Sequence, residues 1–325
     1  MFIKYPFLKY VAATLLGLFV LCILIILWIF FWPLTDKRLQ TGAEASATYS
    51  QAIEKIAKIN KLETEKKVEK TCESQLLTHG QKTAKTVVMF HGVTACPSQF
   101  RELAEQFFAS GYNVYIPRAP YHGTSNLKDH GQVTAQELVA YANESITTAT
   151  GLGEEVGAIG LSGGAVVATW AAEYRPEVQR LLTLSPFYET AASQAPKWQL
   201  PMLKKLHGFH ILPEAFSGEN NTGFSLRALA NYLIVVENLK KDPSNLHLKS
   251  IGTVVSASDD VIDLDLALTI PSKIAKSNNL TLLSRTLPKE WNVGHAIVAP
   301  DEKGVAERKT ELFSLYQAFY EGRQP

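Results

Sequence analysis

Residues 156–174 read VGAIGLSGGAVVATWAAEY, and this stretch decides the fold class. Its first six residues form an apolar run typical of a buried strand, and its last ten carry apolar residues at helical spacing. Between them lies the motif G-x-S-x-G, from Gly160 to Gly164, at a strand-to-helix turn. The small residues allow a sharp turn that holds the Ser162 hydroxyl in an exposed position. The stretch therefore predicts a nucleophilic serine within an α/β protein.

Strand and helix patterns alternate on both sides of this motif. The predicted strands are 73–78, 86–91, 113–117, 156–161, 180–185, 251–256 and 280–285. The predicted helices are 99–110, 134–148, 164–174, 225–239 and 305–320. Such alternation predicts an α/β domain over residues 71–325, with a mostly parallel sheet covered by helices on both faces. Residues 188–224, rich in Pro, Lys, His and aromatic residues, interrupt the alternation and are predicted to form a cap.

The composition excludes several classes of protein. The chain has 325 residues, and its 32 Lys and Arg against 31 Asp and Glu leave a formal charge of +1, which offers no basic field for nucleic acid. Three Cys are too few for a disulfide scaffold. The histidines are scattered, and the sequence contains neither H-E-x-x-H nor paired C-x-x-C, so no metal site is predicted.

An uncharged segment occupies residues 10–35. Within it, Val11 to Trp32 is a run of 22 almost entirely apolar residues, which as a helix would span about 33 Å, enough for a bilayer's hydrocarbon core. We therefore predict a single-pass membrane anchor over residues 1–35. The alternative is a cleaved signal peptide, whose apolar region is shorter, about 7–15 residues. The flanking positive charges nearly balance; we expect the N-terminus inside and the bulk of the chain on the exoplasmic or periplasmic side.

Residues 36–70 are rich in Lys, Glu and Ala and are predicted to form a charged helical stalk. Ile53, Ile56 and Ile59 recur at three-residue steps, a spacing that indicates an amphipathic helix. We expect this apolar stripe to pack on the domain that follows. The alternative is a helix that lies in the membrane interface.

A nucleophilic serine needs a histidine as its base and an acid that orients the histidine. When the serine lies on a strand–turn–helix motif, the acid and then the histidine follow it along the chain. Of the eight histidines, only His295 lies beyond the sixth predicted strand and its following acids. The first carboxylate past that strand is Asp259, with Asp260 as the alternative and Asp263 as a helix cap. The candidate catalytic residues are therefore Ser162, Asp259 and His295.

The oxyanion of an acyl-transfer intermediate needs two N–H donors. The Gly163 amide, at the start of the predicted helix, is one candidate. The other is the Val93 amide, in the loop that follows the strand 86–91. Gly92 precedes it and lets the backbone approach a substrate. Val93 and Gly163 are therefore the predicted oxyanion-hole residues.

These motifs in combination resemble the α/β-hydrolase superfamily. The resemblance is carried by residues 91–94 (HGVT), 160–164 (GLSGG), 258–261 (SDDV) and 294–298 (GHAIV). Residues 117–123 (PRAPYHG) also resemble the carboxylesterase and monoglyceride-lipase branch. The resemblance covers residues 72–325 and implies an eight-stranded, mostly parallel sheet, a helical lid, and ester hydrolysis without a cofactor. In that branch His122 would be structural and not a base.

The predicted function is that of a membrane-anchored serine hydrolase that cleaves carboxylic esters, as a carboxylesterase, a lysophospholipase or a monoacylglycerol lipase does. The alternatives are an acyltransferase or thioesterase with the same triad, and a non-catalytic membrane-tethered binding module. The expected partners are a small-molecule or lipid ester and the bilayer. Trp198 in the cap and Trp291 near His295 are predicted to contact the substrate. Cys72 and Cys96 flank the first main strand and could pair if the domain is exported.

Overall fold

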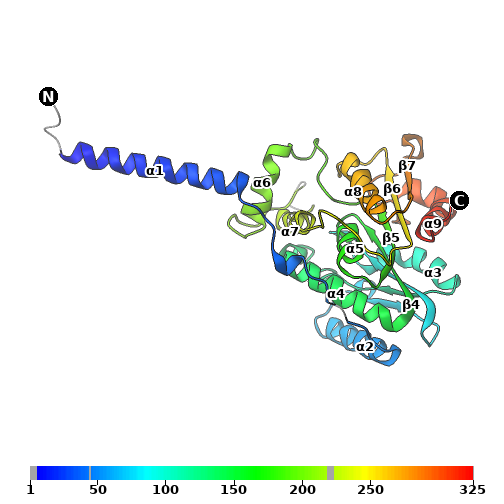
Figure 1. Cartoon of the computed structure of the whole chain (residues 1–325). Helices are drawn as coiled ribbons and strands as arrows, with labels where there is room; N and C mark the ends of the chain where they lie inside the picture. The colour runs from blue at the N-terminus through cyan, green and yellow to red at the C-terminus, as the bar shows by residue number, and fades with distance from the viewer. Residues whose placement is uncertain (1–5, 44, 218–222, 325) are drawn as a thin grey trace.

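The computed structural model describes residues 6–43, 45–217 and 223–324; residues 1–5 of the predicted anchor, 218–222 of the predicted cap, and residues 44 and 325 lie outside the described residues (Figure 1). Within the described chain, seven strands form one sheet in the order β1-β3-β2-β4-β5-β6-β7. They are β1 (Gln75–Leu77), β2 (Thr83–Phe90), β3 (Asn113–Ile116), β4 (Gly153–Leu161), β5 (Val178–Leu184), β6 (Ser250–Ser256) and β7 (Leu282–Leu287).

All neighbouring strands in this sheet are parallel except β1, which pairs antiparallel with β3. The mostly parallel α/β sheet predicted from the alternating patterns is therefore confirmed. The described residues contain seven strands where the resemblance implied eight, because the segment before β1 folds as a helix and adds no further strand.

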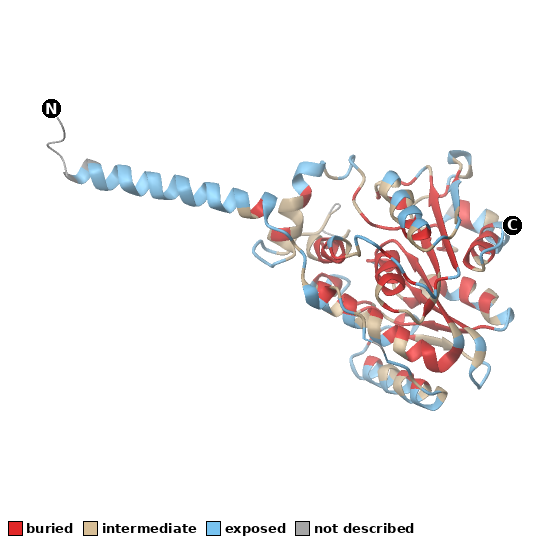
Figure 2. Ribbon diagram, viewed as in Figure 1, coloured by how far each residue is buried: buried red, intermediate tan, exposed pale blue. Residues whose placement is uncertain are grey.

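Helices bury both faces of the sheet (Figures 1 and 2). On one face, α3 (Arg101–Ala109) and α9 (Lys303–Tyr320) pack over a core that includes Val87 and Met89 of β2. On the other face, α4 (Ala135–Leu152), α5 (Gly163–Tyr174), α7 (Leu226–Glu237) and α8 (Leu264–Ser277) pack over a core that includes Val88 and Phe90. Because successive side chains of a strand point to opposite faces, the continuous apolar run of β2 serves both cores.

The N-terminal helix α1 (Pro6–Phe31) projects from the rest of the molecule, and almost all of its described side chains are exposed (Figure 2). Its segment Lys9–Phe31 is the one helix, among the residues that the structure describes, that is long and apolar enough to cross a membrane. The predicted N-terminal apolar helix is therefore present.

Helix α2 (Tyr49–Glu65) lies within the predicted stalk and packs on α4. It begins with a capping box, in which the Thr48 hydroxyl accepts from the Gln51 amide and the Gln51 side chain accepts from the Thr48 amide. Ala52 and Ile56 are buried in the same core as α4. Gly151 of α4 permits the close approach, since a Cβ there would lie 2.8 Å from the Ala52 Cβ.

Short helical turns between β5 and α7 form the cap: η5 (Lys197–Gln199), α6 (Leu200–Met202) and a π-helical turn, η6 (Leu203–His207). The turn η6 packs on α7, and α6 contacts the carboxyl end of α1 (Figure 1). An isolated bridge between Phe216 and Ser225 ties the end of the cap to the start of α7. The cap therefore lies between α1 and α7 and contacts both.

Candidate active site

Ser162 occupies the turn between β4 and α5, in the middle of the sheet. Its backbone has φ +56° and ψ −121°, a conformation that costs free energy in any residue with a side chain. Glycine is required on both sides of the turn. A Cβ at Gly160 would lie 2.3 Å from the Gly164 carbonyl oxygen, and a Cβ at Gly164 would lie 1.9 Å from the Phe90 carbonyl oxygen. The small residues of the motif therefore allow the close packing that presents Ser162.

The side chains of Ser162, His295 and Asp259 form a continuous hydrogen-bonded row. The Ser162 Oγ lies 2.8 Å from His295 Nε2, and His295 Nδ1 lies 2.7 Å from Asp259 Oδ2. Asp259 follows β6, and His295 lies in the loop after β7. In the neutral histidine with its proton on Nδ1, Nδ1–H donates to Asp259 and Nε2 accepts the serine proton. This is the arrangement that a histidine base requires.

The two neighbouring acids are placed differently from Asp259. The Asp259 carboxylate is completely buried, and its Oδ1 accepts from the Val261 amide at 2.9 Å. Asp260 is exposed to solvent. The Asp263 side chain accepts from the Leu266 amide at the start of α8, which confirms its prediction as a helix cap.

The two predicted oxyanion residues lie beside each other. A Cβ at Gly163 would be 2.5 Å from the Val93 Cγ2, so the two residues are in close contact. Gly163 is the first residue of α5, and its N–H is one of those that a helix leaves without an internal acceptor. The buried Val93 N–H donates to no acceptor among the residues that the structure describes. Both amides are therefore available to an oxyanion.

Two buried histidines support the loop that carries Val93. The Nε2 of His122 lies 2.6 Å from the Val93 carbonyl oxygen, and its Nδ1 lies 2.7 Å from the Pro120 carbonyl oxygen. The Nδ1 of His91 lies 2.9 Å from the Gly92 carbonyl oxygen, and the Nε2 of His91 accepts from the Ala119 amide. These contacts attach the loop to the segment after β3.

Both supporting histidines are neutral at neutral pH. Burial lowers the pKa of His91 to about 3 and that of His122 to about 4, because a charged ring is poorly solvated in the interior. A neutral imidazole has one N–H, so His122 donates to only one of its two carbonyl neighbours. Neither ring is hydrogen bonded to Ser162 in the described structure, and His295 is the histidine that contacts the serine.

A cavity of about 130 Å³ opens beside Ser162. Most of its walls are apolar side chains, from the loop after β5, from the cap and from the start of α7. The described residues that line it are Ser162, Phe187, Thr190, Gln194, Ala195, Leu203, Ser217, Phe224, Leu226, Leu229 and Val261. The cavity is well below the roughly 300 Å³ at which drug-sized pockets begin. The cavity is therefore too small to enclose a long hydrocarbon chain.

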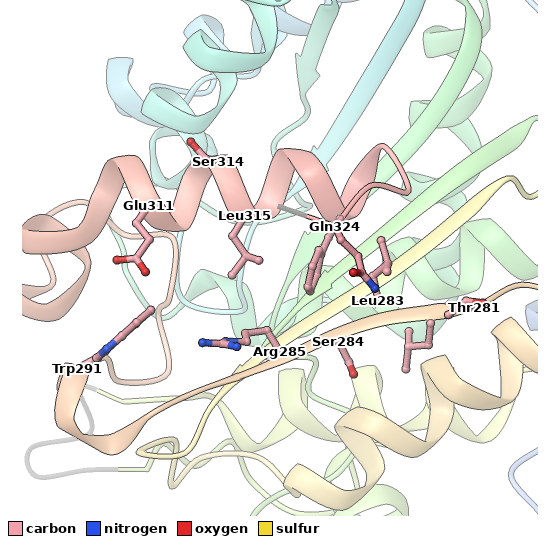
Figure 3. Close-up of a pocket in the computed structure, with 11 residues that line it drawn as sticks. Thr281, Leu283, Ser284, Arg285, Trp291, Glu311, Ser314, Leu315 and Gln324 are labelled. Carbon is pink, nitrogen blue, oxygen red and sulfur yellow. The ribbon is translucent and has the colours of Figure 1, made fainter.

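The structure does not bring the two predicted substrate tryptophans to this cavity. Trp198, in η5, is 62% exposed and does not line it. Trp291 lines a separate hollow between β7 and α9, together with Arg285 and Glu311 (Figure 3). The Arg308 guanidinium lies 4.5 Å from the centre of the Trp291 ring. The left-handed backbone of Asn292 turns the chain between Trp291 and His295, so proximity in sequence did not place Trp291 beside the serine.

Fold and site together define the class of protein. A mostly parallel sheet, a serine on the turn after a central strand, and an acid and then a histidine after later strands are the arrangement of the α/β-hydrolases. The chain belongs to the serine aminopeptidase S33 family, whose sequence pattern matches residues 81–271. The matched stretch includes Ser162 and Asp259 but ends before His295. The prediction of a serine hydrolase is confirmed at the level of the family.

Known lipases are similar to this chain. A thermostable monoacylglycerol lipase from Bacillus sp. (strain H-257) is 28% identical over 109 residues, which are 34% of this chain and 43% of the lipase. The match therefore spans less than half the length of that relative.

Solved structures show the same fold. A soluble variant of monoglyceride lipase from Saccharomyces cerevisiae aligns with a TM-score of 0.57 at 12% identity, over 78% of this chain and 91% of that one. The monoacylglycerol lipase of Paleococcus ferrophilus aligns with a TM-score of 0.57 at 16% identity, over 75% of this chain and 98% of that one. The predicted α/β-hydrolase fold and the resemblance to the monoglyceride-lipase branch are confirmed.

Sequence reasoning did not identify the residues that form the cavity. Phe187, Leu229 and Val261 come from three separate elements, and each reads in sequence as an ordinary core residue. A usable signal existed for Phe187, since it follows β5 at the carboxyl edge of the sheet, where sites of this fold gather. The role of Leu203 could not be inferred, because the path of the cap is irregular.

Proposed function

We propose that this protein is a membrane-anchored serine hydrolase that cleaves carboxylic esters of the monoacylglycerol or lysophospholipid type. The observation that carries the proposal is the hydrogen-bonded row of Ser162, His295 and Asp259 beside an apolar cavity. Here Ser162 and His295 are proposed as nucleophile and base, and Asp259 as the acid that orients His295. Val93 and Gly163 are proposed as the oxyanion-hole donors.

In this mechanism the Ser162 Oγ attacks the ester carbonyl carbon while His295 Nε2 accepts the serine proton. The carbonyl oxygen becomes an oxyanion beside the Val93 and Gly163 amides. The intermediate then collapses: its bond to the leaving alkoxide breaks, and His295 returns the proton to that oxygen. A water molecule, deprotonated by the same histidine, then attacks the acyl carbon of the acyl-enzyme. The bond between that carbon and the Ser162 Oγ breaks, His295 returns the proton to Oγ, and the carboxylic acid is released. Asp259 stabilises the imidazolium in both halves of the reaction.

The walls of the cavity favour an acyl chain over an amino-terminal peptide. An aminopeptidase must bind a free ammonium group, and a buried charge is normally paired with an opposite charge. None of the described residues that line the cavity is acidic. Phe187, Leu203 and Leu229 instead offer apolar surface to a hydrocarbon.

The proposal includes the arrangement of the chain in the membrane. We propose residues 1–35 as an uncleaved anchor with the N-terminus inside, residues 36–70 as a helical connection, and residues 71–325 as the hydrolase domain outside. The disulfide between Cys72 and Cys96 supports this orientation, because disulfides persist in oxidising compartments. Alkylation of cysteines in intact cells tests it: a chain that offers no thiol at these positions until reductant is added agrees with it, and free thiols there contradict it.

The activity is tested with the full chain in mixed micelles. The substrates are p-nitrophenyl esters from acetyl to palmitoyl, mono-oleoylglycerol and an aminoacyl p-nitroanilide, with Ser162→Ala as the matched control. We expect hydrolysis of the esters and not of the anilide, and a loss of roughly 10⁴-fold or more in Ser162→Ala. Preferential cleavage of the anilide would contradict the proposal. Fluorophosphonate labelling of Ser162 without ester hydrolysis would point to an acyltransferase.

A further inference from the structure

The carboxyl end of α1 is bound to the cap through Lys205. The Lys205 ammonium donates to the carbonyl oxygens of Trp28 and Trp32, the latter at 2.6 Å, and lies 5.5 Å from the centre of the Trp28 ring. Trp28 lies in the last turn of α1, where its carbonyl oxygen also accepts from the Trp32 amide at 3.3 Å, and Trp32 is the first residue past the helix. Carbonyl groups at a helix end lack a full set of intrahelical donors and are satisfied by groups from outside the helix. A cation at this end also interacts favourably with the helix dipole. Lys205 therefore acts as a helix cap supplied by another part of the chain.

The residues after α1 are also held on the domain. The Asn238 side chain donates to the Leu34 carbonyl at 3.0 Å and accepts from the Asp36 amide at 2.7 Å. The Trp170 indole donates to the Leu39 carbonyl at 2.6 Å, and Leu39 is buried. The segment from α1 to Leu39 is therefore a fixed connection, and the direction in which α1 leaves the domain is set by these contacts.

The cap presents apolar side chains at the level of the last turns of α1. The Phe209 ring lies 6.2 Å from the Trp28 ring. Trp28 is four residues before Trp32, about 6 Å along the helix, so the Phe209 ring lies at the level of the last turn of α1. Phe209, Ile211 and Leu212 are 52%, 56% and 40% exposed, although large apolar side chains are normally buried. We call the run Phe209–Leu212 the cap loop.

We propose that the cap loop is a second membrane-contacting surface, which inserts into the boundary between headgroups and acyl chains of the leaflet that α1 leaves. The inference rests on the proposed membrane anchor. If α1 spans the bilayer, the contact between Trp28 and Phe209 places the cap loop at the depth of the helix's last turns. Exposed apolar residues continuous with a membrane helix are then covered by lipid. Lys205 is the positioning residue that keeps the loop at this depth.

This placement connects the bilayer to the cavity. Leu203 lines the cavity beside Ser162, and it lies two residues before Lys205 in the same turn, η6. The wall of the cavity and the clamp on α1 are therefore parts of one short element. A single-chain lipid ester in that leaflet would meet the cap loop before it meets the serine.

The depth of the cap loop is tested on the full chain in vesicles of phosphatidylcholine and phosphatidylglycerol, about three to one. Cys22→Ser removes the free thiol of α1, and an environment-sensitive fluorophore is attached at Ile211→Cys or at the control Leu246→Cys. Leu246 is 95% exposed and lies in the loop before β6. This loop is at the amino ends of the parallel strands, whereas Ser162 follows the carboxyl end of β4. We expect lipids with a spin label near the headgroup to quench the label at 211 several-fold more than the label at 246.

The outcomes separate this inference from the proposed function. Protein that stays with the vesicles in alkaline carbonate but shows equal quenching at both positions retains its anchor and overturns the membrane contact. A label at 211 that is shielded from water but not quenched by lipid is covered by protein, and this too overturns it. Protein that is released by carbonate refutes the anchor itself.

A second measurement uses activity. We expect Ile211→Ser with Leu212→Ser to lower hydrolysis of mono-oleoylglycerol in vesicles on the order of tenfold, with hydrolysis of soluble p-nitrophenyl acetate unchanged. Leu246→Ser should change neither rate. Lys205→Met should reduce quenching at 211 as well as activity on vesicles, whereas a purely structural lysine would change stability alone. Equal vesicle activity in the double variant and in Leu246→Ser would overturn the proposal.

Discussion

Replacement of Asp259 by asparagine tests the role of each acid after β6. In the native site, Asp259 Oδ2 faces His295 Nδ1 at 2.7 Å and Oδ1 accepts from the Val261 amide at 2.9 Å. Asparagine has one carbonyl oxygen and one NH₂ group, so it offers an acceptor at only one of the two positions that the carboxylate oxygens occupy. If its oxygen stays with the Val261 amide, its NH₂ group faces His295 Nδ1. The histidine must then carry its proton on Nε2, where it can no longer accept the Ser162 proton.

The wrong histidine tautomer is expected to lower kcat by about 10⁴-fold, or about 5.4 kcal/mol of transition-state stabilisation. Folding should be little affected, because the substitution conserves shape and keeps the hydrogen bond to Val261. Asp260→Asn is the matched control, since Asp260 is the adjacent residue and its side chain is exposed. We expect it to keep kcat within about twofold of the native enzyme, as surface substitutions usually do.

The assay is hydrolysis of p-nitrophenyl butyrate together with the rate of fluorophosphonate labelling, and circular dichroism verifies folding. Both rates report the nucleophilicity of Ser162, so they should fall together in Asp259→Asn. The reasoning is refuted if folded Asp259→Asn retains more than about a tenth of native kcat. It is equally refuted if Asp260→Asn is the inactive variant.

Three other perturbations have defined outcomes. Gly163→Ala should lower kcat by about 10²-fold or more in the ester assay, because its Cβ would lie 2.5 Å from Val93 Cγ2 and displace an oxyanion donor; native kcat would contradict this. Replacing Cys72 and Cys96 by serine should lower the free energy of unfolding by about 3 kcal/mol in urea titrations, since their disulfide closes a loop with a sequence separation of 24; an unchanged midpoint would contradict this. Burial raises the pKa of Glu173 from 4.5 to about 8, so between these pH values the folded state holds a proton that the unfolded state releases. The free energy of unfolding should therefore fall as the pH rises from 4.5 to about 8, and Glu173→Gln should flatten that fall in urea titrations at a series of pH values.

The sheet could be predicted from sequence because its strands are short apolar runs separated by helical patterns. All seven strand predictions overlap a strand of the structure. The eighth strand came from the resemblance alone, and the described residues do not contain it. The pattern at Ile53 and Ile56 predicted an apolar stripe that packs on the following domain, and α2 does pack there, but the pattern could not say which helix it contacts. Only the structure shows that Ala52 and Ile56 share the core of α4.

Chain order was enough to select Ser162 and His295, because each lies where this fold places it. The choice between Asp259 and Asp260 depends on which side chain points towards His295. The order of the two aspartates favoured Asp259, but the sequence does not show the direction of either side chain. Trp198 and Trp291 were predicted from the chemistry of their side chains, and the sequence does not show where those side chains point. Their side chains follow local backbone turns, and those turns lead Trp198 to solvent and Trp291 to another hollow.

Lys205 could not be identified from sequence, because it belongs to a stretch that also contains Lys204 and two histidines and reads as an ordinary solvated segment. Its environment distinguishes it: Lys205 is 2% exposed, and a buried ammonium must find acceptors. The acceptors it finds are the carbonyl of Trp28, in the last turn of α1, and that of Trp32, just past the helix.

The disulfide and the contacts of Lys205 with the end of α1 together support the orientation proposed for the chain. Disulfides such as Cys72–Cys96 persist in oxidising compartments, which agrees with the side of the membrane proposed for the domain. Lys205 binds the carboxyl end of α1, so that end lies on the same side of the membrane as the domain. The cap loop is beside it, through the contact of Phe209 with Trp28. The reverse orientation would keep the clamp but place the disulfide in a reducing compartment. Under the proposed orientation, the enzyme draws its esters from the exoplasmic leaflet.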